Sequence, residues 1–485
     1  MLRHASIYFL FRAGNGVVAL LSLVLLTRWL PAEQYGRYAL GISGANVIAA
    51  LGFQWLNVSV GRFHGSRGIA ARPLFETAQR CALVLGVAIL AGALLLAALA
   101  GPLTGSSGFI LTVAALGVTL GVHGLHLQFL NARQEALRYG WLTASRAWMA
   151  LGLSLAAVCS GGLATAALAG TLVGSAAAVA LFGARKPSPP DAGDAAAHAG
   201  AIAPELLRFG LPLSLTYLSI AILDAADRFM LNHWHGPAAV AAYGAAFDLV
   251  QQILGAALNV LYLAAYPKII AAWERDGGEA AKAALAPLRR AALTLAPLGA
   301  LLFAGLAPEI AGFMLGTQVS ASAAAVMPAI AVAVAFSGMR AFCFDIALHL
   351  RRATRLHVTM TALMAGLNIA LNVLLIPRFG ALGAAAASAA AFSLGAALSL
   401  WFGRTDGLFD NIWLDLTRSA LAVLAGWACI RLAQFQMLNL PHDSLVDAPP
   451  VRLLLCASLG IAGYLAVNEL IRFIQQRYLR PAPRH

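Results

Sequence analysis

Charged side chains lie within several long apolar segments of this sequence. Asp224, Asp227 and Arg228 share one such segment, Asp248 lies in the next, and Arg12 lies in the first. A charged side chain at the centre of a bilayer costs about 2.5–3.5 kcal/mol, so such residues usually face a cavity or a partner. Carboxylates can bind a proton or a cation, and a guanidinium can bind an anion. The residue types therefore indicate ion binding inside a membrane.

The spacing of these residues distinguishes structural pairs from candidates for function. Asp224 and Arg228 are one helical turn apart and can form a salt bridge, which leaves Asp227 to pair elsewhere or to titrate. For Arg340 and Asp345, in a later segment, we favour an ion pair within one helical bundle.

Asp248 and Arg12 have no such local pair. Asp248 has no basic residue within one turn of its own segment, which makes it the stronger candidate for function. Arg12 is close enough to the predicted inner surface that its guanidinium could instead extend into the interface. We take Asp224, Asp227 and Asp248 as candidate ion-coupling residues.

Neutral polar side chains concentrate in the same parts of the chain. Asn15, Asn46 and Gln54 lie in the first two apolar segments, and Gln251 follows Asp248. A single Asn or Gln can simply hold two helices together by hydrogen bonds. Their concentration in the leading segments of each half favours a polar lumen between two lobes.

The elements that must position these residues are transmembrane helices. The chain has 485 residues, of which 60% are hydrophobic and 11% charged, whereas soluble domains carry about 25% charged residues. Apolar runs reach the roughly 20 residues that cross about 30 Å of hydrocarbon. The sequence predicts an all-α polytopic membrane protein with about 14 transmembrane helices. They cover residues 7–30, 38–60, 77–100, 109–130, 141–159, 163–183, 206–232, 238–264, 288–306, 323–348, 358–376, 381–402, 414–432 and 452–472.

Basic residues predict the orientation. Of the 33 lysines and arginines, the predicted outside segments hold only Arg28, Arg37, Arg378, Arg431 and Arg452. Arg12, Arg228 and Arg340 lie inside spans, and we assign all the others, Arg146 included, to inside segments. Because basic loops stay on the cytoplasmic side, both termini are expected there. The basic loops suit anionic membrane lipids, and no module for nucleic acid is present.

Composition divides the chain into lobes. The segment 183–210 is rich in Pro, Gly, Ala and Asp and is typical of a linker. The stretch LLTRWLPAEQYGRYAL (25–40) aligns with MLNHWHGPAAVAAYGA (230–245) at equivalent points of two six-span blocks, which suggests a parallel repeat. We expect an N-terminal six-helix lobe (1–184), a cytoplasmic linker (185–205), a C-terminal six-helix lobe (206–403), and two additional helices with a basic tail (404–485).

The sequence contains no motif that indicates an enzyme. The sequence contains no P-loop, no HExxH and no CxxC, so we expect no catalytic residue, metal site or cofactor, and no use of ATP. Transport energy would then come from an ion gradient, the membrane potential or consumption of the product.

Three stretches resemble a known family. LTRWLPAEQYGRYAL (26–40), DAADRFMLNHWHGPAAVAAYGAAFDLVQQ (224–252) and LNIALNVLLIPRFGALGAAAAS (367–388) are similar to signatures of the polysaccharide-transport (Wzx-type) oligosaccharide flippases. These flippases belong to the multidrug/oligosaccharidyl-lipid/polysaccharide (MOP) exporter superfamily. The order and spacing agree over nearly the whole chain, although Ala241 replaces the glycine that Gly36 provides in the first repeat.

The resemblance implies a V-shaped, two-lobe transporter of the bacterial inner membrane. It would move undecaprenyl-diphosphate-linked oligosaccharide to the periplasmic leaflet for lipopolysaccharide, capsule or exopolysaccharide synthesis, beside a polymerase and chain-length machinery. It implies a diphosphate site, for which Arg12 and Arg228 fit best. The sugars would then occupy the polar lumen. That lumen contains Asn15, Asn46, Gln54 and Gln251.

Two other classes remain open. A multidrug exporter of the same superfamily would extrude small cations through a carboxylate-lined lumen. A membrane polysaccharide polymerase or glycosyltransferase would need catalytic groups on a large outside loop, and the longest one, 433–451, is short.

Overall fold

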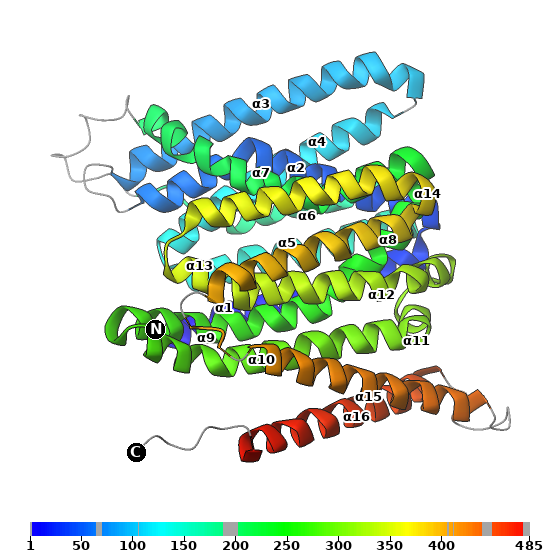
Figure 1. The fold of residues 1–485 in the computed structure, drawn as a ribbon. Coiled ribbons are helices and arrows are strands. Elements are labelled where there is room, and N and C mark those ends of the chain that lie inside the picture. The colour runs from blue at the N-terminus through cyan, green and yellow to red at the C-terminus, as the bar shows by residue number, and fades with distance from the viewer. Residues whose placement is uncertain are drawn as a thin grey trace. The chain divides into compact units, whose positions relative to one another are not determined.

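The chain folds into long helices. The computed structural model describes residues 2–64, 70–104, 106–187, 202–404, 407–410, 412–438 and 449–478, and these contain no β-strand (Figure 1). Among the described residues, 12 helices are long and apolar enough to cross a membrane. The predicted all-α polytopic fold is therefore confirmed, and the chain is a multi-pass membrane protein.

The chain divides into two compact units, Met1–Ala241 and Ala242–His485, here called unit 1 and unit 2. Most of the predicted linker lies outside the described residues, so the predicted lobe boundaries stay predictions. The first unit contains α1 (Leu2–Trp29), α2 (Ala32–Phe63), α3 (Ala71–Thr104), α4 (Ser107–Ala132), α5 (Ala136–Cys159), α6 (Ala164–Phe182) and α7 (Ile202–His235).

Pro31 separates α1 from α2. It lies at the N-terminal boundary of α2, with φ −54° and ψ 149°. Proline cannot donate a backbone hydrogen bond, and the extended ψ ends the helical path. The break falls at the predicted tip between the first two spans.

Helix α2 packs closely against α7 and against the first residue of α8 (Pro237–Val250). A Cβ atom on Gly36 would overlap the Pro237 carbonyl group, and one on Gly210 would overlap the Trp55 carbonyl oxygen. About one turn beyond the Gly210 contact on both helices, the Ser59 Oγ donates a hydrogen bond of 2.8 Å to the Leu206 carbonyl oxygen. These contacts fix the register between α2 and α7, and with it the positions of the polar residues of α7 along α2.

The second unit contains the remaining helices. They are α8 (Pro237–Val250, which begins in unit 1), the π-helix η1 (Gln251–Gly255), α9 (Ala256–Asp276), α10 (Gly278–Gly305), α11 (Ala307–Met314), α12 (Thr317–Met339), the π-helix η2 (Arg340–Phe344), α13 (Ile346–Leu350), α14 (Thr354–Gly403), α15 (Ile412–Leu438) and α16 (Pro449–Tyr478).

Helix α14 contains two predicted spans, 358–376 and 381–402. They meet at Gly380, whose φ of 55° and ψ of −131° are not helical. A positive φ favours glycine because a Cβ atom would clash there. The chain therefore turns between these spans without an intervening loop.

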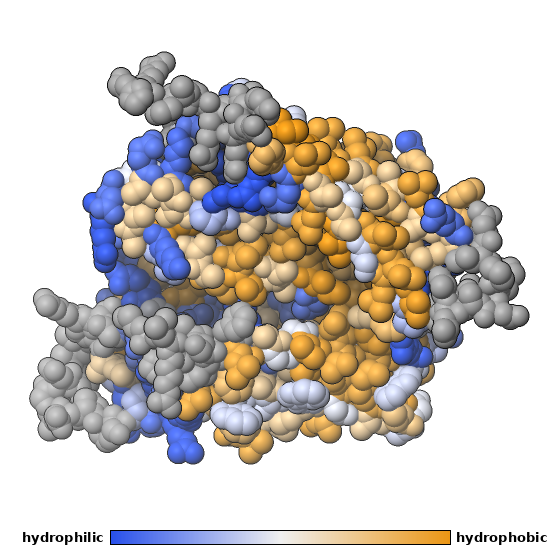
Figure 2. All heavy atoms as spheres, turned by 90° about the horizontal axis from the view of Figure 1, so that it is seen from below, coloured by the Kyte–Doolittle hydropathy of each residue, from blue (hydrophilic) through white to orange (hydrophobic). Residues whose placement is uncertain are grey.

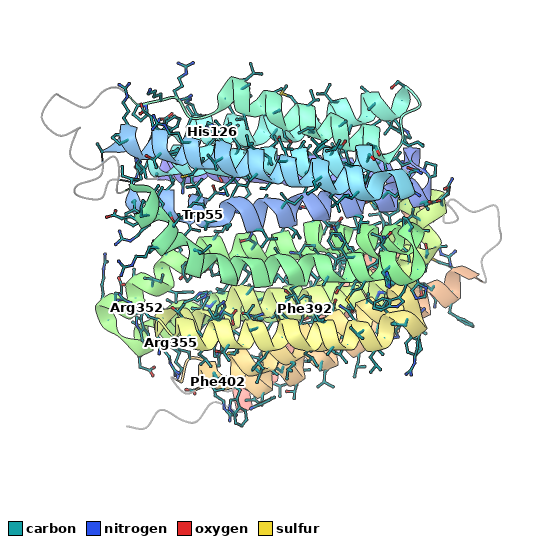
Figure 3. All side chains as sticks on the ribbon, turned by 90° about the horizontal axis from the view of Figure 1, so that it is seen from above. Trp55, His126, Arg352, Arg355, Phe392 and Phe402 are labelled. Carbon is teal, nitrogen blue, oxygen red and sulfur yellow. The ribbon has the colours of Figure 1, made fainter. Side chains whose placement is uncertain are left out.

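The surfaces of both units are apolar along the helices. Large hydrophobic side chains are widely exposed, among them Leu83 at 68% and Leu95 at 62% on α3. Figure 2 shows apolar residues over most of one face and hydrophilic residues gathered toward helix ends. In unit 2, Arg352 and Arg355 lie at one such end, beside the turn that joins α13 to α14 (Figure 3). Contiguous exposed apolar surface of this extent indicates contact with lipid.

Candidate substrate-binding sites

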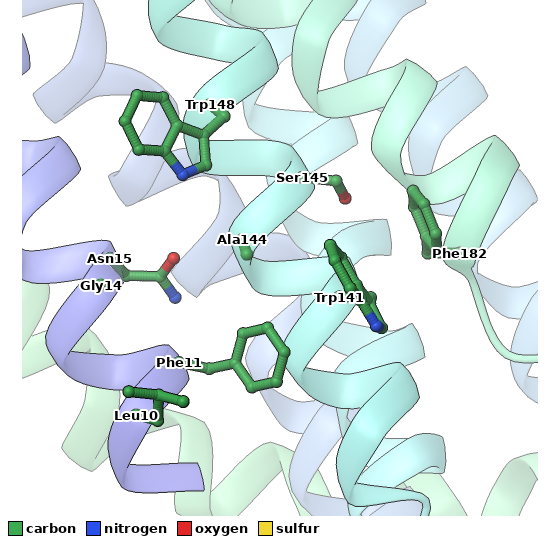
Figure 4. Close-up of a pocket in the computed structure, with 9 residues that line it drawn as sticks. All are labelled: Leu10, Phe11, Gly14, Asn15, Trp141, Ala144, Ser145, Trp148 and Phe182. Carbon is green, nitrogen blue, oxygen red and sulfur yellow. The ribbon is translucent and has the colours of Figure 1, made fainter. Parts of the chain in front are cut away.

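Unit 1 contains a pocket between α1, α5 and α6. Its volume is about 410 Å³, and its lining is mostly aromatic and aliphatic (Figure 4). It is lined by Leu10, Phe11, Gly14, Asn15, Trp141, Ala144, Ser145, Trp148 and Phe182. Binding sites for small molecules usually measure about 300–1,000 Å³, with a few polar groups on an apolar wall. The pocket has the size and the composition of such a site.

Three of the rings that line this pocket contact one another. The Trp141 ring stacks on Phe182 at 6.3 Å between centroids and 19° between planes. Phe11 meets the same indole edge-on, at 5.8 Å and 63°. Trp148, two turns further along α5, has no aromatic contact among the described residues and is 56% exposed. One indole is therefore held in a ring cluster, whereas the other is more than half exposed.

Asn15 is one of two polar side chains in the pocket lining. Its amide extends from α1 toward α5 (Figure 4) and makes no hydrogen bond with another described residue. The other is Ser145, whose hydroxyl donates to the Leu142 carbonyl oxygen at 3.3 Å. The structure thus places one predicted lumen residue in a pocket, with its hydrogen-bonding groups available.

Arg12 lies on α1 close to this pocket. Its side chain is exposed and forms no hydrogen bond or ion pair with another described residue. It precedes Asn15 by three positions, which places the two side chains on neighbouring parts of the helix surface. An exposed guanidinium without such partners can form hydrogen bonds with an anion.

Arg228 occupies a different place in unit 1. Its Nη1 donates a hydrogen bond of 2.9 Å to the Ser43 hydroxyl of α2, and Asp227 beside it is buried, at 4% exposure. The side chain of Asp224 lies outside the described residues, so its predicted salt bridge with Arg228 stays a prediction. The structure therefore does not place Arg228 in the lining of the pocket that contains Asn15.

The other lumen candidates divide between the units. In unit 1, Asn46 is exposed and Gln54 is half-buried, both on α2 and both outside the pocket lining. In unit 2, Asp248 is half-buried near the end of α8, and Gln251 is exposed at the start of η1. π-Helical turns are frequent at functional sites. A lumen shared by both groups stays a prediction.

Unit 2 also contains a buried ionic cluster. The Arg340 Nε lies 3.4 Å from the Asp345 Oδ2, and the Arg340 Nη2 donates to the Thr361 hydroxyl at 2.7 Å. The Ser399 hydroxyl donates to the Asp345 Oδ1 at 2.5 Å. His357 Nδ1 lies 3.6 Å from the same carboxylate. The predicted ion pair within one bundle is present, and it joins η2 to α14.

Sequence reasoning missed Arg146. We assigned it to an inside segment, but it lies in α5, well past the first residue, Ala136. Its side chain is half-buried, and it lies within electrostatic range of Tyr38 and His123. Its Nε is buried without a hydrogen-bond partner, and no ion pair joins it to another described residue. The signal was present, because the predicted span 141–159 already contained this arginine.

Comparisons with known proteins show similarity of fold. No protein-family model matches the sequence, and a search of curated proteins found no match. The inward closed conformation of the lipid II flippase MurJ aligns with a TM-score of 0.74 at 12% identity, over 99% of this chain and 100% of that one.

Multidrug transporters share the fold too. An inward-facing multidrug resistance MATE family transporter of the MOP superfamily aligns with a TM-score of 0.63 at 14% identity, over 83% of this chain and 96% of that one. A MATE structure in a bent conformation gives 0.51 at 15% identity, over 85% and 94%. The chain therefore has the fold of MOP-superfamily transporters, as its sequence signatures suggested.

Proposed function

We propose that this chain is a flippase for undecaprenyl-diphosphate-linked oligosaccharide. It moves the lipid from the cytoplasmic to the periplasmic leaflet of the bacterial inner membrane, for lipopolysaccharide, capsule or exopolysaccharide synthesis, with both of its termini in the cytoplasm. The sequence signatures support this substrate, and the fold shared with a lipid II flippase supports the transport of a lipid-linked headgroup.

The observation that carries the proposal is the charge of unit 1. Arg12 and Arg146 have no ion-pair partner among the described residues. A cation without an ion-pair partner in an apolar lobe costs free energy, and the binding of an anionic substrate can offset that cost. A diphosphate supplies several acceptor oxygens, and hydrogen bonds from arginine to phosphate are among the strongest in proteins.

The proposed mechanism assigns a role to each of these groups. Arg12 engages the diphosphate from the cytoplasmic side, and the glycan occupies the polar lumen to which Asn46, Gln54 and Gln251 contribute. The prenyl chain stays in lipid beside α15 and α16. The units then rock between inward-open and outward-open states. Protonation of Asp227 or Asp248 resets the cycle, and a polysaccharide polymerase with its chain-length machinery consumes the product.

The second candidate is export of cationic drugs. The likeness to multidrug transporters favours it, as do the carboxylates of Asp227 and Asp248. A cation, however, would gain nothing from Arg12 or Arg146, since like charges repel. We therefore rank it second.

Complementation tests both candidates. The chain is expressed in a bacterium that lacks its own oligosaccharide flippase, and surface polysaccharide is measured with the inner-leaflet pool of lipid-linked repeat unit. Restored polymer with a drained pool is the expected result. A host that instead gains resistance to cationic drugs, with the pool still full, would support the exporter.

A further inference from the structure

We infer that the pocket between α1, α5 and α6 is a subsite for a sugar ring of the transported headgroup. The inference rests on the proposed function and assigns part of the substrate to this pocket. Two features support it, an indole that is more than half exposed and an amide whose hydrogen bonds are not used within the protein.

Trp148 supplies the stacking surface. Its indole is 56% exposed while lining the pocket. The π face of an indole carries partial negative charge, and the C–H groups on one face of a pyranose carry partial positive charge. A pyranose therefore packs flat on such a ring. The other indole, Trp141, lies two turns earlier on α5 and is already held by its ring contacts with Phe11 and Phe182.

Asn15 distinguishes a sugar from a hydrocarbon chain. Its amide offers two donors and an acceptor, which match adjacent sugar hydroxyls. If a prenyl or acyl chain filled the pocket, the amide would lose its water without gaining a hydrogen bond, which would weaken binding roughly tenfold. The pocket is thus poorly suited to the lipid tail, although most of its lining is apolar.

Arg12 connects this subsite to the diphosphate. It lies three positions before Asn15 on α1, which corresponds to about 4.5 Å of helix rise. The sugar directly attached to a diphosphate lies one glycosidic bond from the phosphate oxygens. A diphosphate at Arg12 therefore brings the first sugar, rather than a distal one, to Asn15 and Trp148.

The test uses purified full-length protein and matched lipid probes. Undecaprenyl diphosphate is compared with the same lipid carrying one N-acetylglucosamine, glucose or galactose, and Kd is measured by thermophoresis in detergent. The wild type should bind at least one sugar probe about tenfold more tightly than the bare lipid, because the sugars share a stacking face but differ in the groups that the Asn15 amide would meet.

Three variants separate the possible outcomes. Trp148→Leu and Asn15→Leu should reduce the sugar preference to threefold or less without changing the Kd of the bare lipid. Trp413→Leu, at an indole of α15 that is 65% exposed, should change neither value. A sugar preference that survives both pocket substitutions would overturn the inference, as would tighter binding of every probe by Asn15→Leu, which marks a hydrocarbon site. A wild type that binds no probe would overturn the proposed function itself.

Discussion

Replacing Arg12 by alanine should abolish transport without harming the fold. The side chain is exposed and forms no hydrogen bond or ion pair with another described residue. Its loss should therefore change the free energy of unfolding by no more than about 0.5 kcal/mol, as at ordinary surface positions. The protein should reach the membrane at its normal level.

The loss of binding is much larger. A hydrogen bond to a charged group contributes about 1.5–3 kcal/mol, and a factor of ten in affinity corresponds to about 1.4 kcal/mol. Removing the guanidinium should thus weaken binding of the diphosphate lipid by roughly 10- to 150-fold. Arg12→Lys keeps the charge but loses the planar fork of donors, so an intermediate loss is expected.

The assay is the complementation described above, with the variant's amount in the membrane measured in parallel. Arg80→Ala is the matched control, because Arg80 is also exposed, also lies in unit 1 and is not predicted to contact substrate. Normal surface polymer from the Arg12→Ala strain would refute the phosphate role. Equal losses in both variants would indicate a general effect of charge on the unit.

Three further predictions concern the fold and the energy source. Gly36→Ala should lower the melting temperature in detergent, because its Cβ would overlap a carbonyl at the start of α8, whereas Gly16→Ala, which meets nothing within 4 Å, should not. Asp345→Ala should destabilise unit 2 by about 3–5 kcal/mol, seen as loss of folded protein on size-exclusion chromatography, because it leaves a buried guanidinium uncompensated. Asp227→Asn or Asp248→Asn should remove the sensitivity of transport to a collapsed proton gradient; unchanged sensitivity in both variants would end the coupling hypothesis.

The helical fold was predictable because hydropathy is a strong signal in membrane proteins. The turn at Gly380 falls between two predicted spans, 358–376 and 381–402. Helix limits were less predictable. Helix α10 begins at Gly278 rather than near residue 288, because helices continue beyond the apolar region that hydropathy detects. Helix α11 was missed, since eight residues are too few to stand out in a predicted loop.

The pocket could be predicted only in part. Asn15 was a candidate because an amide in an apolar segment is conspicuous. Trp141 and Trp148 carry no such signal, since tryptophan is common at membrane interfaces and its orientation depends on helix packing. The prediction for Arg146 was wrong for another reason. We counted this arginine with the basic residues of a loop, although it lies within helix α5.

The sign of the charge in unit 1 is the strongest argument about the substrate. The fold alone is compatible with flippases and with drug exporters, since both groups align with this chain. The ligand that a lobe selects depends on the side chains that are not already paired within the protein. In the described part of unit 1, the side chains that make no ion pair include the guanidinium groups of Arg12 and Arg146, while the carboxylate of Asp227 is buried. Cations that the protein does not neutralise favour an anionic ligand over a cationic one, which is why we propose the diphosphate of a lipid carrier as the substrate and place its first sugar in the neighbouring pocket.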